Sequence, residues 1–297
     1  MPESIGVFKK TRIAPTPSGF LHLGNVLSFA LTAAIAQKTG AKILLRIDDL
    51  DRERVNKLYV QDIFDTLNFL EIPWDEGPRN LHEYESIYSQ QHRMAIYQAA
   101  LQQLKESGEV FACQCSRAQI HNQNADDIYP GTCRNQQIPF ETPDTAWRLH
   151  TGDKRELLIN TLNDGLVKTS LPVVMQDFIV KKKDGNPSYQ LASVIDDLFF
   201  GVDLVVRGED LWPSTQAQHY LALSLQQAYF QQITFHHHSL LMEPSDKKLS
   251  KSAGATSVHY LREQGKKPAE IYSAIARIKG NNEPINNWQQ LAALLIN

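Results

Sequence analysis

The stretch from Thr11 to Asn25, which reads Thr-Arg-Ile-Ala-Pro-Thr-Pro-Ser-Gly-Phe-Leu-His-Leu-Gly-Asn, constrains the fold of this chain more than any other. Thr11–Ala14 reads as the end of a strand, and two prolines followed by Ser18-Gly19 force a tight turn. The Ala- and Leu-rich run 25–38, closed by Gly40, predicts a buried helix with a C-terminal glycine. A strand, a glycine turn and a helix N-terminus in this order create a place where a phosphate can meet backbone N–H groups.

Two motifs far apart in the chain carry the side chains that such a phosphate site needs. His22 and Asn25 direct donors to the turn, and Gly24 allows a flat base to approach the backbone. The second motif, Lys248-Leu249-Ser250-Lys251-Ser252, sets paired lysines among small hydroxyl residues, which suits a mobile clamp on a polyphosphate. Each motif alone is also typical of an ordinary turn. Their joint occurrence, with an α/β pattern between them, indicates nucleotide chemistry.

Composition bounds the class of protein. The chain has 297 residues, 42% hydrophobic and 21% charged, which predicts a soluble globular protein of one large domain or two closely joined ones. It has no apolar run of about 18 residues, and the segment 1–10 lacks the apolar core of a signal peptide. We therefore expect a cytoplasmic protein without membrane contact. A net charge of −3 means that any surface for RNA has to be local.

The order of the predicted elements is that of an α/β protein. Lys42–Ile47 reads as a strand followed by Asp48-Asp49-Leu50-Asp51-Arg52, and acidic residues at the carboxyl end of a strand line ligand crevices in open α/β sheets. The same segment also suits a polar loop with a helix N-cap. For His236–His238 we favour a structural role, because neighbouring residues of an extended chain point to opposite sides. We further expect helices over 57–71, 87–107, 189–199 and 213–229, and strands over 109–112, 203–207 and 239–242.

The cysteines form a sequence cluster. All three fall within 21 residues, from 113 to 133: Cys113, Cys115 and Cys133. Cys-x-Cys places two thiols on one turn, and the third cysteine follows a Pro-Gly turn, which suits a tetrahedral zinc site short of one protein ligand. Three nearby side chains are candidates for that ligand: His121, Asp126 and Tyr129. Chemistry alone favours His121, because a phenol with a pKa near 10 must first be ionised by the metal. Three unrelated buried thiols are the alternative.

An inserted small domain is expected between the two halves of the sheet. Strands and a turn are predicted over 147–150, 155–162 and 173–183, with a basic hairpin tip at Lys181–Asn186 that is either a solvated turn or a contact for a phosphate backbone. Short helices should follow over 257–263, 268–278 and 287–296. The expected organisation is a Rossmann-like catalytic domain in two halves (1–108 and 189–238), an inserted zinc-binding domain (109–188) and a C-terminal segment (239–297) that opens with the lysine motif.

These motifs resemble those of a known family. The histidine and lysine motifs are similar to the HIGH and KMSKS signatures of class I aminoacyl-tRNA synthetases, and three further segments resemble the glutamyl branch of that class: Arg12–Gly19, Arg46–Arg52 and Val206–Leu211. The Cys-x-Cys and Tyr-x-x-x-Cys pattern is similar to the zinc site of glutamyl-queuosine tRNA(Asp) synthetases, which join glutamate to the queuosine base in the anticodon loop of tRNA(Asp). The resemblance runs from about Thr11 to Ala255. It implies a class I synthetase fold, α/β with a Rossmann-like parallel sheet, an inserted zinc-containing domain and a short C-terminal helical segment.

The resemblance also implies a role for each motif residue. The glutamate pocket would comprise Arg12, Ile13, Ala14, Pro15, Thr16, Asp48, Tyr189 and Arg207. In it, Arg12 would grip a carboxylate with a bidentate fork and Asp48 would accept from the ammonium group. ATP and its phosphates would be met by His22, Gly24, Asn25, Lys248 and Lys251, all but the glycine acting in catalysis. One structural zinc would be held by Cys113, Cys115, Tyr129 and Cys133, so the resemblance selects Tyr129 over His121.

Two positions depart from the family pattern. The family usually has Glu where this chain has Asp48, and the histidine motif ends in Asn25 rather than in a second histidine. A carboxylate one methylene shorter needs a water or a backbone shift to make the same contact. Neither departure removes a charge.

The expected reaction is activation of L-glutamate by ATP and Mg²⁺ without tRNA, followed by transfer of glutamate to queuosine in tRNA(Asp). After the lysine motif 45 residues remain (253 to 297), fewer than the anticodon-binding region of a glutamyl-tRNA synthetase needs, so we expect no such domain. The rival readings are a minimal glutamyl-tRNA synthetase that charges a tRNA 3′ end, a non-catalytic tRNA-binding relic and an adenylyltransferase of small metabolites. We expect a monomer.

Overall fold

The computed structural model describes residues 6–123, 126, 128–152, 155–242 and 257–295. The chain divides into two compact units and passes between them after residues 92, 203, 209 and 235. The first unit contains the chain up to residue 92 together with 204–209 and everything from 236 onward, and the second contains 93–203 and 210–235. No helix among the described residues is both long enough and apolar enough to cross a bilayer.

The first unit is built around short parallel strands and the helix that joins them. Its elements in chain order are β1 (Lys10–Ile13), α1 (Leu23–Thr39), β2 (Lys42–Leu45), α2 (Lys57–Phe69), α3 (Leu81–Glu83), β8 (Leu204–Gly208), α8 (Val258–Glu263), α9 (Pro268–Ile278) and α10 (Trp288–Leu295). β1 pairs with β2 in parallel, with Arg12 opposite Leu44. β8 lies beside β1, where Nη1 of Arg12 donates to the carbonyl of Val206 at 3.3 Å. The strand–helix–strand order confirms the predicted parallel α/β arrangement.

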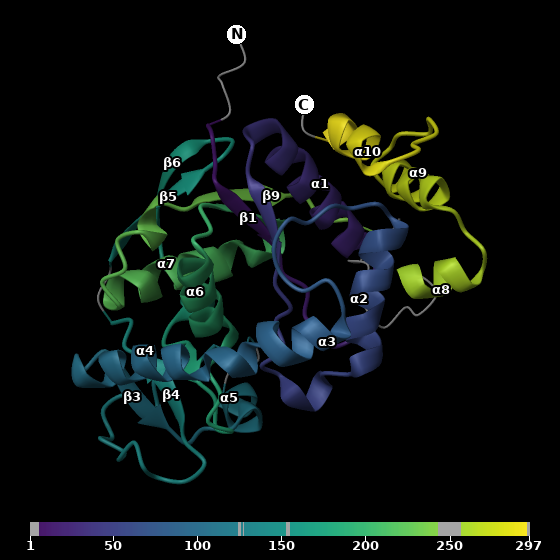
Figure 1. Cartoon of the computed structure of the whole chain (residues 1–297). Helices are drawn as coiled ribbons and strands as arrows, with labels where there is room; N and C mark the ends of the chain where they lie inside the picture. The colour runs from purple at the N-terminus through teal and green to yellow at the C-terminus, as the bar shows by residue number, and fades with distance from the viewer. Residues whose placement is uncertain (1–5, 124–125, 127, 153–154, 243–256, 296–297) are drawn as a thin grey trace. The chain divides into compact units, whose positions relative to one another are not determined.

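α1 is mostly apolar and mostly buried. Eleven of its 17 residues are buried. One side packs on β1, β2 and β8, and the other side packs against α9 and α10, the last two helices of the chain (Figure 1). Gly40, with φ at 78°, ends the helix in a left-handed conformation that costs glycine little. The predicted buried helix with its C-terminal glycine is confirmed.

One buried carboxylate organises the acidic segment after β2. Asp49 is fully buried and accepts hydrogen bonds from Tyr84 Oη and Ser89 Oγ, each at 2.6 Å, and from the Gln90 amide at 2.9 Å. These bonds hold a π-helical turn over 84–88 and a 3₁₀ turn over 90–93. The long helix expected over 87–107 therefore begins only at Met94, because Ser89 and Gln90 are committed to Asp49.

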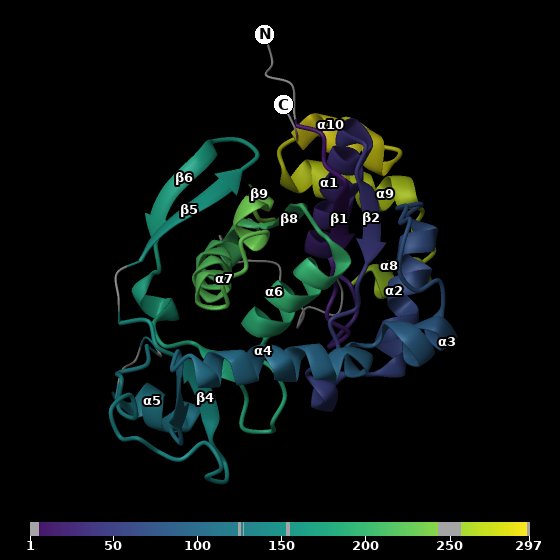
Figure 2. The ribbon, with the colours of Figure 1, turned by 60° about the vertical axis from the view of Figure 1, so that its left-hand side comes forward.

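The second unit contains two small sheets and the helices that pack on them. Its elements are α4 (Met94–Glu106), β3 (Val110–Cys113), α5 (Arg117–Gln123), β4 (Ala146–Leu149), β5 (Glu156–Thr161), β6 (Gly165–Ser170), β7 (Ile179–Lys181), α6 (Tyr189–Phe200) and α7 (Trp212–Ser224). β3, β4 and β7 form an antiparallel sheet. β5 and β6 form a hairpin (Figure 2). Asp196 of α6 is buried and accepts from Arg93 Nε at 2.8 Å and from Tyr97 Oη at 2.6 Å, which ties α6 to α4.

Two expectations for this half of the chain are wrong. The strand expected over 239–242 lies earlier, as β9 (Thr234–His238), so the three histidines belong to the strand itself. Thr234 and Phe235 pair in parallel with β5, because a β-branched and an aromatic residue favour extended backbone there. The segment 173–183 forms a 3₁₀ turn and then only three residues of strand. Asp177 interrupts it at a φ of 47°.

Candidate active site and metal centre

His22 is the N-cap of α1, and the cap fixes the orientation of its ring. Nδ1 of His22 accepts from the Gly24 amide at 3.1 Å, and Oδ1 of Asn25 accepts from the His22 amide at 3.0 Å. The two bonds form a reciprocal capping box. Because Nδ1 is an acceptor, the proton of the neutral ring lies on Nε2, which makes Nε2 the donor. Asn25 uses its carbonyl oxygen in the cap, so its amide group is the end that can donate elsewhere.

Gly24 provides room for that ring. A Cβ built on Gly24 would lie 2.9 Å from Cε1 and 3.0 Å from Nδ1 of His22, closer than real Cβ contacts. The sequence suggests that Gly24 lets a base approach the backbone. The structure shows a second reason for glycine, because any larger residue would displace the His22 ring.

The backbone after β1 runs alongside the backbone after β2. The carbonyl of Ile13 accepts from the Arg46 amide at 2.9 Å, and the carbonyl of Pro15 accepts from the Asp48 amide at 3.0 Å. Ile13 and Pro15 are buried, whereas Ala14 and Thr16 are partly exposed. The structure therefore brings Asp48 next to the segment 13–16, as expected of one pocket.

Two buried arginines make this part of the first unit positive. Arg12 on β1 is 6% exposed and Arg207 on β8 is 5% exposed. The pKa of His237 on β9 is lowered to about 3. Burial is the largest cause and the charge of Arg207 is the second, while the neighbouring histidines and Arg12 contribute less. Of these causes, only the positive charge of the arginines favours an anion, because burial disfavours a charge of either sign. The environment of these arginines thus suits a carboxylate ligand.

Asp48 is already paired with an arginine. Its two oxygens accept from Arg46 Nε at 2.7 Å and from Arg46 Nη2 at 3.1 Å, and the side chains are 10% and 2% exposed. A bidentate pair of this kind fixes both side chains. An ammonium group that binds Asp48 would therefore join an existing ion pair.

Three further side chains are predicted ligands of glutamate and ATP: Tyr189, Lys248 and Lys251. Tyr189 is the first residue of α6 in the second unit, capped by Ser188, and is 44% exposed. Lys248 and Lys251 lie outside the described residues. The described chain resumes at Ser257, which forms an antiparallel bridge with His22.

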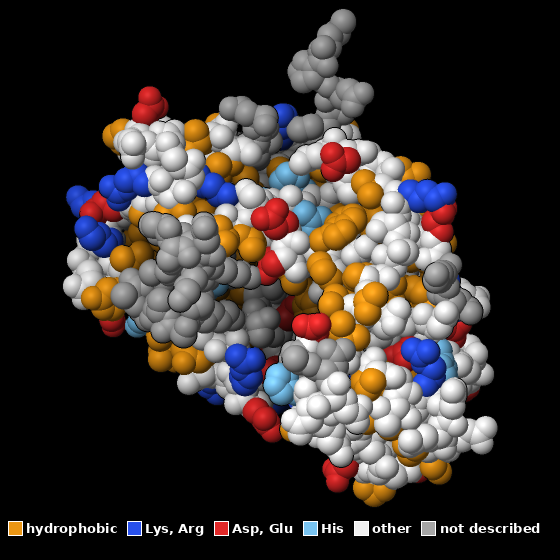
Figure 3. Space-filling view, turned by 180° about the vertical axis from the view of Figure 1, so that it is seen from behind, with side chains coloured by type: hydrophobic (Ala, Val, Ile, Leu, Met, Phe, Trp, Pro, Cys, Tyr) orange, Lys and Arg blue, Asp and Glu red, His pale blue; other side chains and the backbone are white. Residues whose placement is uncertain are grey.

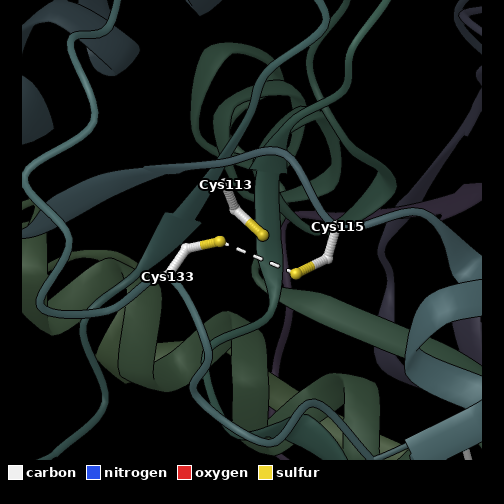
Figure 4. A group of neighbouring side chains, drawn as sticks. All are labelled: Cys113, Cys115 and Cys133. Carbon is white, nitrogen blue, oxygen red and sulfur yellow. Dashed lines mark hydrogen bonds between the residues drawn. The ribbon is translucent and has the colours of Figure 1, made fainter.

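The three cysteines converge in the second unit. Their sulfurs lie within 4.8 Å of one another, and Sγ of Cys115 is 3.6 Å from Sγ of Cys133 (Figure 4). Cys113 ends β3, and the other two thiols point toward it from the chain that follows. Such a group could hold a metal such as zinc, and thiolates are the ligands that structural zinc prefers. The alternative of three unrelated thiols does not fit this convergence.

Tyr129 belongs to the same cluster. Its hydroxyl is 3.6 Å from Sγ of Cys113, accepts from the Cys133 amide at 2.8 Å, and the side chain is 7% exposed. His121, in the last turn of α5, and Asp126 are both exposed. Among the residues that the structure describes, the group of candidate metal ligands contains the three cysteines and neither His121 nor Asp126. Three thiols and one phenol oxygen are thus close enough to serve as four ligands.

A buried arginine compensates the charge that this cluster would carry. Nε of Arg148, on β4, donates to Sγ of Cys113 at 3.3 Å, and its guanidinium lies 3.8 Å from the centre of the Tyr129 ring. Burial opposes ionisation of Cys113, but the hydrogen bond from Tyr129 and the charge of Arg148 prevail and lower the pKa of that thiol. For Cys115, burial and the neighbouring thiols raise the pKa to about 12. Arg148 therefore favours the ionised form of Cys113 within the cluster.

The basic hairpin tip is engaged within the fold. Lys181 lies 4.4 Å from the centre of the Trp147 ring, Lys182 pairs with Asp184 at 2.8 Å, and Lys183 donates to the carbonyl of Gln114 at 2.7 Å. Gln114 stands between two of the cysteines, so Lys183 supports the Cys-x-Cys turn. On the face in Figure 3, lysines and arginines occur in small groups next to acidic side chains rather than as one basic surface.

Three residues at these sites escaped prediction: Arg46, His237 and Arg148. Arg46 stands two positions before Asp48, and this spacing was the sequence signal from which their ion pair could have been predicted. His237 was hidden in a run of three histidines. Arg148 is distant from the cysteines in sequence, and only the pairing of Phe111 with Arg148 in the β3–β4 register brings it there.

The family of the chain follows from comparison with known proteins. Residues 9–290 match the family model described as tRNA synthetases class I (E and Q), catalytic domain. The chain belongs to this family. The same fold occurs in a glutamate-tRNA synthetase from Elizabethkingia anophelis, with a TM-score of 0.74 at 23% identity, which covers 96% of this chain and 65% of that one.

Two groups of relatives stand out by name. The chain is 33% identical over 285 residues to a glutamyl-Q tRNA(Asp) synthetase of Symbiobacterium thermophilum, covering 91% of this chain and 86% of that protein, and 34% identical to one of Synechococcus sp., covering 89% and 81%. It is 32% identical to glutamate–tRNA ligase 2 of Syntrophus aciditrophicus, covering 90% of this chain but 56% of that ligase. The chain thus spans little more than half the length of the glutamate–tRNA ligases that it matches.

Proposed function

We propose that this chain activates L-glutamate with ATP in the absence of tRNA and transfers it to the queuosine base in the anticodon loop of tRNA(Asp). The observation that carries the proposal is the cluster of Cys113, Cys115, Tyr129 and Cys133, whose pattern resembles the zinc site of glutamyl-queuosine tRNA(Asp) synthetases. The identity of 33–34% to two proteins of that name, over more than four fifths of their length, supports the same reaction.

The first step needs positioning more than covalent help from the protein. A carboxylate oxygen of glutamate attacks the α-phosphorus of ATP, the bond to the bridging oxygen breaks, and pyrophosphate leaves. In this proposal Arg12, Arg207 and Tyr189 bind the amino acid. Nε2 of His22 and the amide of Asn25 donate to phosphate oxygens at the N-terminus of α1. Preorganised donors of this kind stabilise the charge that develops on the transferring group.

The lysine motif and a metal ion complete the neutralisation of ATP. Lys248 and Lys251 meet the β- and γ-phosphates in this proposal. Mg²⁺, where bound, supplies further positive charge to the phosphate oxygens. Glutamate then passes from the adenylate to the base, and AMP is released.

The zinc has a structural role in this proposal. Four ligands from the protein leave no open position for catalysis, so one zinc per chain stabilises the inserted domain, 109–188, between the catalytic halves 1–108 and 189–238. Tyr129 is the fourth ligand in preference to His121, because its oxygen already lies 3.6 Å from Cys113. Cys133→Ser should lose the metal and stability. If Tyr129→Phe kept full zinc affinity while His121→Ala lost it, this ligand set would be refuted.

RNA recognition rests on exposed bases of the anticodon loop. Proteins read RNA sequence mainly by stacking and hydrogen bonding to unpaired bases. Few phosphates need to be engaged, which agrees with the net charge of −3 and predicts modest, salt-sensitive binding. The tip Lys181–Lys183 remains a candidate contact, although each of its lysines has a partner within the unit.

A direct assay separates the two possible acceptors. Labelled glutamate should attach to tRNA(Asp) from cells that make queuosine, and the label should survive periodate oxidation of the 3′ end. It should be absent with tRNA from queuosine-deficient cells, which is the matched control. Attachment that needs an intact 3′ ribose and prefers tRNA(Glu) would refute the proposal.

That second outcome would identify a minimal glutamyl-tRNA synthetase. The identity of 32% to a glutamate–tRNA ligase over 281 residues favours this rival. It shares the first step with the main proposal. The acceptor alone distinguishes them.

A further inference from the structure

The first two turns of α1 have an accessible polar strip. Gly24, Asn25 and Ser28 are half-buried, whereas Val26 and Leu27, which stand between them in the sequence, are buried. Residues three and four apart in a helix share a face, so Ser28 lies on the face of Asn25 and Gly24. At a rise of about 1.5 Å per residue, Ser28 is about 4.5 Å further along the helix axis than Asn25. The strip therefore leads from the N-terminus of α1 to the hydroxyl of Ser28.

His238, the last residue of β9, determines how that hydroxyl is oriented. Nδ1 of His238 lies 3.1 Å from the carbonyl of Ser239, which can only accept, so the proton of the neutral ring is on Nδ1. Nε2 is then an acceptor, and it lies 2.6 Å from Oγ of Ser28. The Ser28 hydroxyl therefore donates its one proton to His238, and its oxygen can accept from a ligand.

The imidazole of His238 is itself held in place. Its ring is buried, with 8% of the residue exposed. The carbonyl of Ser239 that accepts from the ring also accepts from Nζ of Lys279, at 3.3 Å, and Oγ of Ser239 lies 2.6 Å from the same Nζ. Lys279 is the C-cap of α9. The end of β9 is thus anchored to α9, and Ser28 presents a fixed acceptor rather than a freely rotating hydroxyl.

A fixed acceptor selects a ligand group that donates. An ordinary serine can donate or accept because its hydroxyl rotates, whereas Ser28 can only accept while His238 holds its proton. In the proposed reaction the phosphates of ATP lie at the N-terminus of α1, beside His22 and Asn25. The sugar is the part of ATP that is joined to the phosphates, and its two hydroxyl groups are donors. The Ser28 end of the strip therefore suits a ribose.

We infer that Ser28, oriented by His238, accepts a hydrogen bond from a ribose hydroxyl of ATP. The inference rests on the proposed function, because it names a further binding residue for the nucleotide of the first step. Ser28 touches the sugar, and His238 is a positioning residue that acts through Ser28. The two residues supply recognition of the ribose, which the predicted contacts of His22 and Asn25 with the phosphates do not provide.

Deoxynucleotides test the contact directly. In glutamate-dependent pyrophosphate exchange, the wild type should use either 2′-deoxy-ATP or 3′-deoxy-ATP about tenfold less well than ATP, measured as kcat/KM for the nucleotide. Ser28→Ala should lose about tenfold with ATP and nothing further with that deoxynucleotide, because both changes remove the same hydrogen bond. Each variant is compared with itself on two nucleotides, so any decrease in its folded fraction cancels from the ratio.

The chain offers a matched control and a conservative replacement. Ser273 of α9 is also half-buried, and its hydroxyl bonds to the backbone of Ile285. Ser273→Ala should keep the full wild-type preference for ATP over the deoxynucleotide. His238→Gln retains an acceptor for the Ser28 hydroxyl and should keep most of this preference, whereas His238→Leu should reduce it about threefold or more.

The possible failures are distinguishable. Equal use of ATP and both deoxynucleotides by the wild type would overturn the inference, as would a deoxynucleotide penalty that persists in Ser28→Ala. Either result would leave the proposed function intact, because exchange with ATP would still be observed. A wild type that shows no glutamate-dependent exchange with any of the three nucleotides would refute the proposed function, and the inference with it.

Discussion

Gly24→Ala tests whether the orientation of the His22 ring governs activation. The added Cβ would lie 2.9 Å from Cε1 and 3.0 Å from Nδ1 of that ring. Relief requires the ring to turn away, because the backbone of the first turn of α1 is fixed by the capping box. The hydrogen bond from the Gly24 amide to Nδ1 is then lost.

The effects on stability nearly cancel, whereas the effect on catalysis does not. Loss of an N-cap costs about 1 kcal/mol. Replacement of glycine by alanine in a helix returns about 0.5–1 kcal/mol. The free energy of unfolding should therefore stay within about 1 kcal/mol of the wild type. Displacement of a donor to the transferring phosphoryl group should lower kcat about a hundredfold.

The assay is glutamate-dependent pyrophosphate exchange alongside urea unfolding. Gly40→Ala is the matched control at the other end of α1. There the φ of 78° penalises alanine by about 1–2 kcal/mol, and no atom lies within 4 Å of the new Cβ. Gly40→Ala should lose stability and keep its kcat, which is the opposite signature. Wild-type kcat in Gly24→Ala, with the protein folded, would refute a catalytic role for the orientation of His22.

Three further predictions concern the other sites. Lys251→Ala should lower kcat for pyrophosphate exchange about a hundredfold or more with little change in the KM for glutamate, as steady-state kinetics can measure. Arg148→Met should weaken zinc binding about tenfold to a hundredfold in a chelator competition, because the cation beside Cys113 is lost. Burial lowers the pKa of His236 to about 4 and that of His237 to about 3. In the unfolded chain both pKa values are near 6.5, so below that pH the unfolded state binds protons that the folded state does not bind. The free energy of unfolding should therefore fall as the pH drops from 6.5 to 4, and His237→Gln should flatten that fall in urea titrations.

The elements that local sequence determines were predictable. The buried helix α1, its glycine cap and the helix Pro268–Ile278 carry their signals within a few residues. The cysteine cluster was predictable for the same reason, since a Cys-x-Cys turn and a later Pro-Gly turn bring the thiols together. β6 was not predicted, because most of its residues are exposed and show no apolar alternation.

Features that depend on contacts between segments far apart in the chain could not be predicted from the sequence. Chemistry alone preferred His121 as a zinc ligand, because a neutral imidazole can bind the metal, whereas a phenol must first be ionised. The fold sets His121 on an exposed helix turn and buries Tyr129 beside Cys113. Likewise, three adjacent lysines suggest a free basic patch, but Lys183 is used to hold the Cys-x-Cys turn. In both cases tertiary packing, which the sequence alone does not show, determines which groups lie beside the side chain.

The pairing of Arg46 with Asp48 bears on how the pocket would select glutamate. The glutamyl branch usually has a glutamate at this position, whose longer side chain would reach further toward a ligand. Here the shorter aspartate keeps both oxygens on Arg46, at 2.7 and 3.1 Å. Its attraction for the ammonium group of a substrate is therefore reduced by a cation at contact distance. The charges of Arg207 and Arg12 are, after burial, among the causes that lower the pKa of His237, so positive charge acts at this place. Selectivity for glutamate over its neutral amide should accordingly depend on these arginines, while Asp48 orients the amino end.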